Sequence, residues 1–323
     1  MATTFRKLVL GLTAAVAGAS VLVAGPQIDS KLPTYRPVSG VSGSIKSIGS
    51  DTMNNLMTLW GEEFKAFYPS VQIEIEGKGS STAPPALIQG QAQFGPMSRP
   101  MKASEIDAFE QRFGYKPTAL RTAIDALAVF VHKDCPLDEI SIQQITEVFS
   151  VAGKDMTWGD LGVTDRGWAS RPISLYGRNS ASGTYGYFKD VALQGNDFKP
   201  SVKEQPGSSA VVQGVASDRY SMGYSGVGYA TADVKMLKVS LDGSEAFPPD
   251  PEYANSGEYP LARFLYVYVN ADPVKGLDPL RAEFVKLIFS KQGQEVVLKD
   301  GYFPVSAKVA REDLKACKIQ PTF

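Results

Sequence analysis

The sequence predicts an α/β protein of two lobes, each a mixed β-sheet flanked by helices. Strand-like runs with alternating apolar residues and helix-like runs with apolar stripes follow one another along most of the chain. Two long apolar strands, at residues 126–131 and 264–269, enclose the middle third of the sequence. If each strand crosses between lobes, the ends of the chain build one lobe and the middle builds the other. The length of 323 residues is sufficient for two such lobes and a hinge.

The N-terminus has the features of a secretory signal peptide. Arg6 and Lys7 precede an apolar run at residues 8–23 that is short for a membrane span. We expect cleavage near Ala24, so that residues 1–24 are removed and the protein is exported; an uncleaved anchor helix is the alternative. Residues 25–43 contain many Pro, Ser and Gly residues and are expected to form a flexible lead-in.

Residues 44–124 are expected to form the first part of one lobe, residues 125–266 the other lobe, and residues 267–323 the second part of the first lobe. Strands are predicted at residues 44–48, 71–75, 92–97, 126–131, 172–176 and 259–270, with a strand or tight turn at residues 222–229. Helices are predicted at residues 53–68, 103–113, 140–150, 185–193, 208–217 and 279–300, and after Pro84 and Pro85.

Composition disfavours several classes of function. The net charge is −1 and there is no block of Lys and Arg, so nothing indicates a nucleic-acid or anionic-membrane surface. The single histidine, His132, has no histidine partner for a metal site. Cys135 and Cys317 lie far apart in sequence and could be bridged in an oxidising compartment or remain free thiols.

Three turns share one pattern, in which a strand leads through Gly or Arg and hydroxyl residues into a helix. They contain Gly49-Ser50-Asp51-Thr52, Gly79-Ser80-Ser81-Thr82, and Arg178 followed by Ser182-Gly183-Thr184. The first amides of a helix have no intrahelical acceptor and lie at the positive end of its dipole, so with nearby hydroxyls they suit phosphate or sulfate. Arg178 would add a forked, permanently charged donor. Ordinary helix capping is the alternative for each turn, but three such turns favour one oxyanion site.

These motifs resemble those of the periplasmic phosphate-binding proteins of bacterial phosphate ABC importers. The resemblance is carried by the three turns and by Phe94-Gly95-Pro96-Met97-Ser98-Arg99, and extends from about residue 45 to the C-terminal helix. It implies a type II-like periplasmic-binding-protein fold whose lobes close on one dehydrated phosphate in the interlobe cleft. It further implies a periplasmic monomer that serves an inner-membrane ABC permease, with no catalysis, metal or other cofactor.

Matching positions give the residues that the resemblance assigns to phosphate. Ser80 would contact it from the first lobe, Arg178 would supply the charged fork, and Ser182, Gly183 and Thr184 would donate from the second lobe. The complete predicted site is Ser50, Asp51, Thr52, Ser80, Ser81, Ser98, Arg178, Ser182, Gly183 and Thr184.

Two positions depart from the family pattern. Many relatives have aspartate where this chain has Ser98, a carboxylate that accepts the proton of phosphate and excludes fully ionised sulfate. Many also have aspartate in place of Ser180, where it orients the arginine. We hypothesise that Asp51 supplies the missing acceptor and that Arg99 adds positive charge at the rim; the alternative is that Asp51 only caps the following helix.

Phosphate capture is therefore the leading function, and another tetrahedral oxyanion such as sulfate is the nearest rival. A secreted phosphatase is disfavoured, because one histidine and two remote cysteines do not provide the nucleophile or metal cluster that phosphoryl transfer needs.

Overall fold

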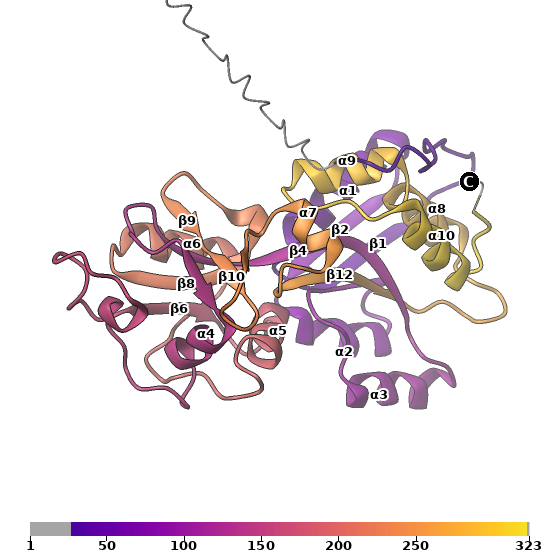
Figure 1. The fold of residues 1–323 in the computed structure, drawn as a ribbon. Helices are drawn as coiled ribbons and strands as arrows, with labels where there is room; N and C mark the ends of the chain where they lie inside the picture. Colours follow the sequence, from indigo (N-terminus) through magenta and orange to yellow (C-terminus); the bar gives the residue numbers. More distant parts are fainter. Residues whose placement is uncertain (1–26, 322) are drawn as a thin grey trace, which may run out of the picture.

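The computed structural model describes residues 27–321 and 323, so the predicted signal peptide lies outside the described residues. Two lobes lie side by side (Figure 1). We call residues 27–126 and 262–321 lobe I and residues 127–261 lobe II, according to the pairing of their strands. Within the described residues, none of the helices combines the length and apolar composition needed to cross a membrane.

One β-sheet continues through both lobes in the strand order β2-β1-β3-β12-β4-β8-β6-β7, with β9 paired to β4. The long strand β4 (Thr118–His132) joins them: its residues up to Ala126 pair with β12 (Ala262–Val269), and from Leu127 it pairs with β8 (Ser221–Gly226). β12 differs from the expectation of a second crossing strand, because it pairs with β3 and β4 of lobe I along its length.

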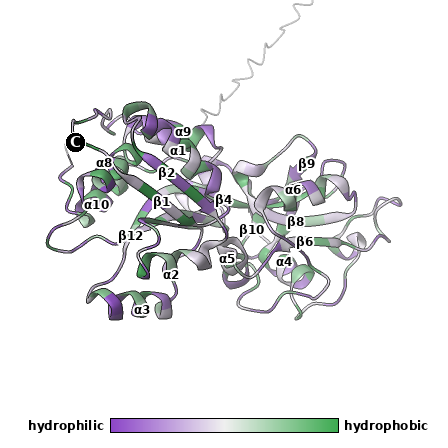
Figure 2. Ribbon diagram, turned by 180° about the vertical axis from the view of Figure 1, so that it is seen from behind, coloured by the Kyte–Doolittle hydropathy of each residue, from purple (hydrophilic) through white to green (hydrophobic). Residues whose placement is uncertain are grey.

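Lobe I has helices on both faces of its sheet. Its strands are β1 (Ser44–Gly49), β2 (Gln72–Gly77) and β3 (Phe94–Met97), beside β12 and the first part of β4. One face is covered by α1 (Asn54–Phe67), α8 (Pro279–Ile288), α9 (Lys291–Lys299) and α10 (Ala307–Ala316), and the other by α2 (Ala83–Ile88) and α3 (Ala103–Phe113). In Figure 2, α3 and α10 each show hydrophilic and hydrophobic parts, as expected for helices that cover a sheet with one side.

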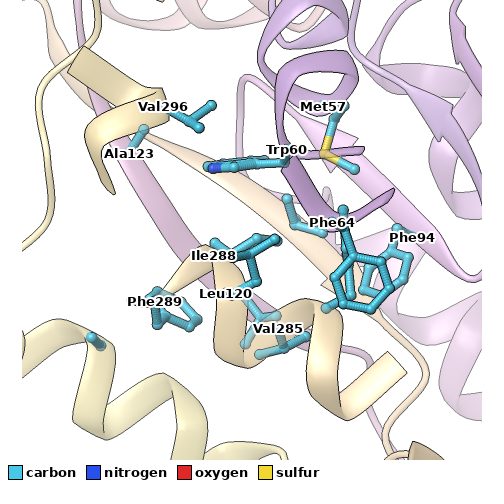
Figure 3. Close-up of a cluster of buried hydrophobic side chains, with 14 of the residues drawn as sticks. Met57, Trp60, Phe64, Phe94, Leu120, Ala123, Val285, Ile288, Phe289 and Val296 are labelled. Carbon is cyan, nitrogen blue, oxygen red and sulfur yellow. The ribbon is translucent and has the colours of Figure 1, made fainter. Parts of the chain in front are cut away.

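The core of lobe I is drawn from both ends of the chain. Figure 3 shows Trp60 and Phe64 of α1 beside Val285 and Ile288 of α8. All four are fully buried, and each such side chain contributes roughly 1.5–3 kcal/mol to stability. The predicted single helix at residues 279–300 is wrong: the chain breaks between α8 and α9, where the Ser290 hydroxyl caps α9 by accepting from Gly293 N.

The predicted flexible lead-in is also wrong for its described part, which packs on lobe I. Leu32, Tyr35 and Val41 belong to the lobe I core, and the Tyr35 hydroxyl donates to the buried Glu283 carboxylate at 2.9 Å. Pro, Ser and Gly dominate the composition of this segment, but its few large apolar residues determine where it lies.

Lobe II surrounds the second part of β4. Its remaining elements are β5 (Glu139–Ser141), α4 (Ile142–Phe149), β6 (Ser174–Arg178), α5 (Gly183–Val191), β7 (Lys203–Gln205), α6 (Ser208–Ser217), β9 (Val234–Met236), β10 (Lys238–Ser240), β11 (Ala246–Phe247) and α7 (Pro251–Ser256). The predicted helices at residues 103–113 and 208–217 are confirmed, with the bounds of α3 and α6.

The two cysteines lie in different lobes. Cys135 is buried in the lobe II core and Cys317 in the lobe I core, and both are free thiols. The alternative of a bridge is therefore excluded in this structure.

Candidate functional site

The predicted site residues gather where strands of both lobes end. β1, β2 and β3 are parallel to each other, as are β6, β7 and β8, so each set presents its carboxyl ends at one edge. Ser50, Ser80 and Ser98 follow the strands of lobe I, and Arg178 ends β6 in lobe II. Open α/β sheets bind ligands at such edges.

The lobe I residues form a buried group of hydroxyls. The Ser50 hydroxyl donates to Ser98 Oγ at 3.1 Å, and the Ser98 amide donates to Ser80 Oγ at 3.0 Å. The Ser80 and Ser98 oxygens are 3.3 Å apart, and all three residues are buried. The structure therefore brings these predicted residues together.

Arg178 is the central cation of lobe II and is 1% exposed. Its Nη1 donates to Ser208 Oγ at 2.7 Å and its Nη2 to the Pro206 carbonyl at 3.3 Å. Burial lowers the pKa of this guanidinium, and the Asp51 carboxylate acts in the opposite direction. Its buried Nε has no partner among the described residues, and a buried donor of this kind is satisfied by an acceptor-rich ligand.

The N-terminus of α5 meets the lobe I hydroxyls. Ser182 caps this helix, since its Oγ accepts from Thr184 N at 3.1 Å and from Tyr185 N at 3.4 Å. A Cβ added at Gly183 would lie 2.2 Å from Ser80 Oγ and 2.7 Å from Ser98 Oγ. Only glycine therefore allows α5 to approach lobe I this closely.

Direct contacts across the lobes surround this group. Thr52 Oγ1 lies 2.9 Å from Thr184 Oγ1. Ser81, which is exposed at the edge, donates through N at 3.2 Å and Oγ at 3.1 Å to the Ala181 carbonyl. The two lobes are thus in contact at the predicted site.

Asp51 also reaches from lobe I to lobe II. Its Oδ2 accepts from Ser208 N at 2.9 Å and lies 3.3 Å from Arg178 Nη1. The N-cap of α1 is Met53, with no side-chain capping bond. The alternative that Asp51 only caps the following helix is therefore wrong, because its carboxylate faces α6 and Arg178.

One expectation about a neighbouring residue needs correction. Arg99 does not add free charge at the rim, because its guanidinium forms two hydrogen bonds, at 2.8 and 2.7 Å, with Glu105 at the start of α3. Ser180 is exposed.

Three residues of this region were missed by the sequence predictions. Ser208 begins α6 with its amide and hydroxyl directed at Asp51 and Arg178, and Gly207-Ser208 after β7 repeats the pattern of the predicted turns. Asp125 and Arg263 form a buried ion pair at 2.8 Å where β4 leaves lobe I. The only signals in the sequence are that Arg263 is a lone charge in an apolar strand and that Asp125 directly precedes the apolar run at residues 126–131.

Comparison with known proteins identifies the family. The profile of the PBP superfamily domain matches residues 35–292. The sequence is 54% identical over 317 residues to the phosphate-binding protein PstS of Pseudomonas aeruginosa, covering 96% of this chain and 98% of that protein. The chain belongs to the PstS family of the PBP superfamily. This is a family of substrate-binding proteins and not of enzymes.

More distant PstS-family members share the fold. Phosphate-binding protein PstS of Staphylococcus haemolyticus is 26% identical, with 94% of each chain covered. A Clostridium perfringens crystal structure with bound phosphate, of a protein assigned as a phosphate ABC transporter substrate-binding protein, has a TM-score of 0.68 at 25% identity. The match covers 81% of this chain and 100% of the Clostridium perfringens chain. The predicted two-lobed periplasmic-binding-protein fold is confirmed.

Proposed function

We propose that this protein binds inorganic phosphate and delivers it to an ABC importer by closure of its lobes around the anion. One observation carries the proposal: a buried arginine, helix N-termini and hydroxyls from both lobes meet in a member of the PstS family. Such groups are donors, and a phosphate dianion is mainly an acceptor of hydrogen bonds.

Each predicted residue receives a role in this proposal. Arg178 supplies the forked charge, and Gly183 and Thr184 donate from the start of α5, which Ser182 caps. The hydroxyls of Ser50, Thr52, Ser80 and Ser98 complete the site from lobe I. Ser81 closes the edge by holding Ala181, and the Asp51 carboxylate accepts a hydrogen bond from the protonated oxygen of monohydrogen phosphate. Hydrogen bonds to charged groups contribute about 1.5–3 kcal/mol each, so a few of them are sufficient for tight binding.

Lobe closure follows from the same contacts. Thr52 and Thr184, like Asp51 and Ser208, meet across the lobes beside Arg178. Separation of the lobes about β4 would break these contacts and open the region to water. Closure would exclude water and strengthen each bond to the anion.

The remaining expectations complete the proposal. The protein would act as a monomer in the periplasm, after removal of residues 1–24, and dock on an inner-membrane permease. Light scattering of the processed protein tests the monomer, and phosphate-dependent stimulation of the reconstituted permease's ATPase tests the partner.

Calorimetric titration tests the binding function. Protein freed of bound ligand by unfolding and refolding is titrated with phosphate and sulfate at pH 5 and pH 8. We expect saturable 1:1 binding of phosphate and far weaker binding of sulfate. No phosphate binding by refolded, folded protein would overturn the proposal.

Sulfate is the second candidate, and one observation favours it. Ser98, at the position where many relatives are expected to have a carboxylate, presents a hydroxyl that can donate to a fully ionised anion. Sulfate binding at least as tight as phosphate binding at both pH values would select this alternative.

A further inference from the structure

Arg263 and Asp125 form a buried ion pair at the junction of the lobes. They stand opposite each other in the register of β12 and β4, one residue before β4 leaves β12. Arg263 Nε and Nη2 donate to Asp125 Oδ2 at 3.0 and 2.8 Å, and both side chains are almost completely buried. Asp125 also accepts from Val227 N of lobe II at 3.2 Å.

The Arg263 guanidinium also contacts both lobes at the proposed site. Its Nη1 donates to the Ser98 carbonyl of lobe I at 2.7 Å, and its Nη2 to Thr184 Oγ1 of lobe II at 2.9 Å. The Tyr187 ring of α5 lies 5.2 Å from the guanidinium, and its hydroxyl donates to the Ala262 carbonyl at 2.7 Å. One side chain thus holds the start of α5 against the end of β3.

Arg263 further constrains the hydroxyls beside it. Thr184 Oγ1 accepts from Arg263, and Ser208 Oγ accepts from Arg178 at 2.7 Å. Thr52 Oγ1 lies between them, 2.9 Å from the first oxygen and 3.4 Å from the second. A hydroxyl that accepts from a guanidinium retains its own hydrogen to donate, so the arginines orient this row of hydroxyls as donors.

We propose that Arg263, anchored by Asp125, is a positioning residue that couples lobe closure to assembly of the anion site. Asp125 and the Ser98 carbonyl hold the guanidinium within lobe I, and its contact with Thr184 forms only when the lobes meet and then directs the Thr184 hydroxyl toward the anion. The proposal rests on the proposed function, since phosphate is the anion used to test it.

The test compares Arg263→Gln and Arg263→Lys with the control Arg121→Gln. Arg121 lies on the neighbouring strand β4 and likewise pairs with an aspartate, Asp313 at 2.6 Å, but it contacts α10 instead of the site. Calorimetry gives phosphate affinity, stopped-flow fluorescence gives association and dissociation rates, small-angle scattering gives compaction on binding, and thermal unfolding gives stability without ligand.

We expect Arg263→Gln to weaken phosphate binding by at least about tenfold, mainly through faster dissociation, as for loss of one partner of a buried charge pair. Compaction at saturating phosphate should be smaller than in the wild type. Arg263→Lys should be intermediate, because lysine keeps the charge but cannot make all the forked contacts. Arg121→Gln should change stability but neither affinity nor compaction.

Two results would overturn the inference: phosphate affinity within about twofold of wild type, or full compaction with an unchanged dissociation rate, in Arg263→Gln. If Arg263→Gln does not fold, the same comparison with Arg263→Lys decides the question. If the wild type itself binds no phosphate, the proposed function fails, and this result is distinct from normal binding by the Arg263 variants.

Discussion

The two lobes contribute different chemistry to the proposed site. Lobe I offers Ser50, Ser80 and Ser98, neutral hydroxyls that already bond to one another, and one carboxylate, Asp51. Lobe II offers the buried Arg178 and the N-termini of α5 and α6. The difference indicates that lobe II attracts the anion, while lobe I completes its enclosure and distinguishes one anion from another.

Loss of Arg178 should have the largest effect on phosphate affinity, because it removes the positive charge by which lobe II attracts the anion. Arg178→Ala should weaken phosphate binding by roughly 2–5 kcal/mol, as for truncation of a buried charge partner. Arg178→Lys should also lose affinity, because an ammonium group cannot reproduce the fork. Calorimetry measures both, with the lobe II surface variant Arg171→Ala as control. Unchanged affinity in both Arg178 variants would remove Arg178 from the site.

Gly183→Ala should break the fit between the lobes without removing a polar group. The new Cβ would lie 2.2 Å from Ser80 Oγ, so closure must displace this short side chain. We expect weakening of about 1–3 kcal/mol, typical of overpacking. Gly186→Ala on the same helix is the control, since its nearest contact would be the flexible Arg99 side chain at 3.3 Å. Equal affinities for the two variants would contradict a closed complex with this contact.

Asp51→Asn tests whether lobe I discriminates between anions. An ionised carboxylate accepts a hydrogen bond from monohydrogen phosphate but repels sulfate, whereas an amide can donate to either anion. We expect the phosphate-to-sulfate affinity ratio to fall by about tenfold, or ~1.4 kcal/mol, in competition calorimetry at pH 8. An unchanged ratio would assign selectivity to another group.

Chemical labelling of the two cysteines should show the smallest effect of phosphate. Each thiol reports on the opening of its own lobe. Burial raises the pKa of Cys135 to about 11 and that of Cys317 to about 12, so labelling at pH 8 requires local opening. The variants Cys135→Ser and Cys317→Ser each keep one thiol. We expect Cys317, at the end of α10, to react faster than Cys135. Phosphate should slow only Cys135, which needs opening of lobe II. The reverse order would show that lobe II is the less stable lobe.

Local patterns predicted the parts of the site that lie within a single turn. Gly, hydroxyl residues and a following helix were enough to place Ser50, Ser80 and Ser182, since strand ends and helix starts are specified by neighbouring residues. Ser208 was not predicted because the strand before it, β7, has only three residues, which are too few to show an alternating pattern.

Residues that depend on tertiary register could not be predicted in this way. Arg263 and Asp125 are 138 residues apart in sequence, and they pair because β12 is aligned with β4 in the sheet. Arg99 was predicted to carry free charge at the rim, because the sequence does not show that Glu105 of the following helix pairs with it. The Asp51 carboxylate accepts from Ser208 N of α6 and does not cap α1, the helix that follows it in sequence. Sequence proximity alone does not indicate this contact.

The division of lobe I between the two ends of the chain determines when its core can form. The Trp60 indole donates to the Gly293 carbonyl at 2.8 Å, and the Phe64 ring packs on Phe284 at 5.2 Å. β1 to β3 and α1 need α8 to α10 from the far end of the chain to complete their core, while most of the lobe II core lies within one continuous segment. Lobe II can therefore form its core before lobe I, and the apolar face of α1 stays uncovered, and open to chaperones, until the C-terminal helices pack on it.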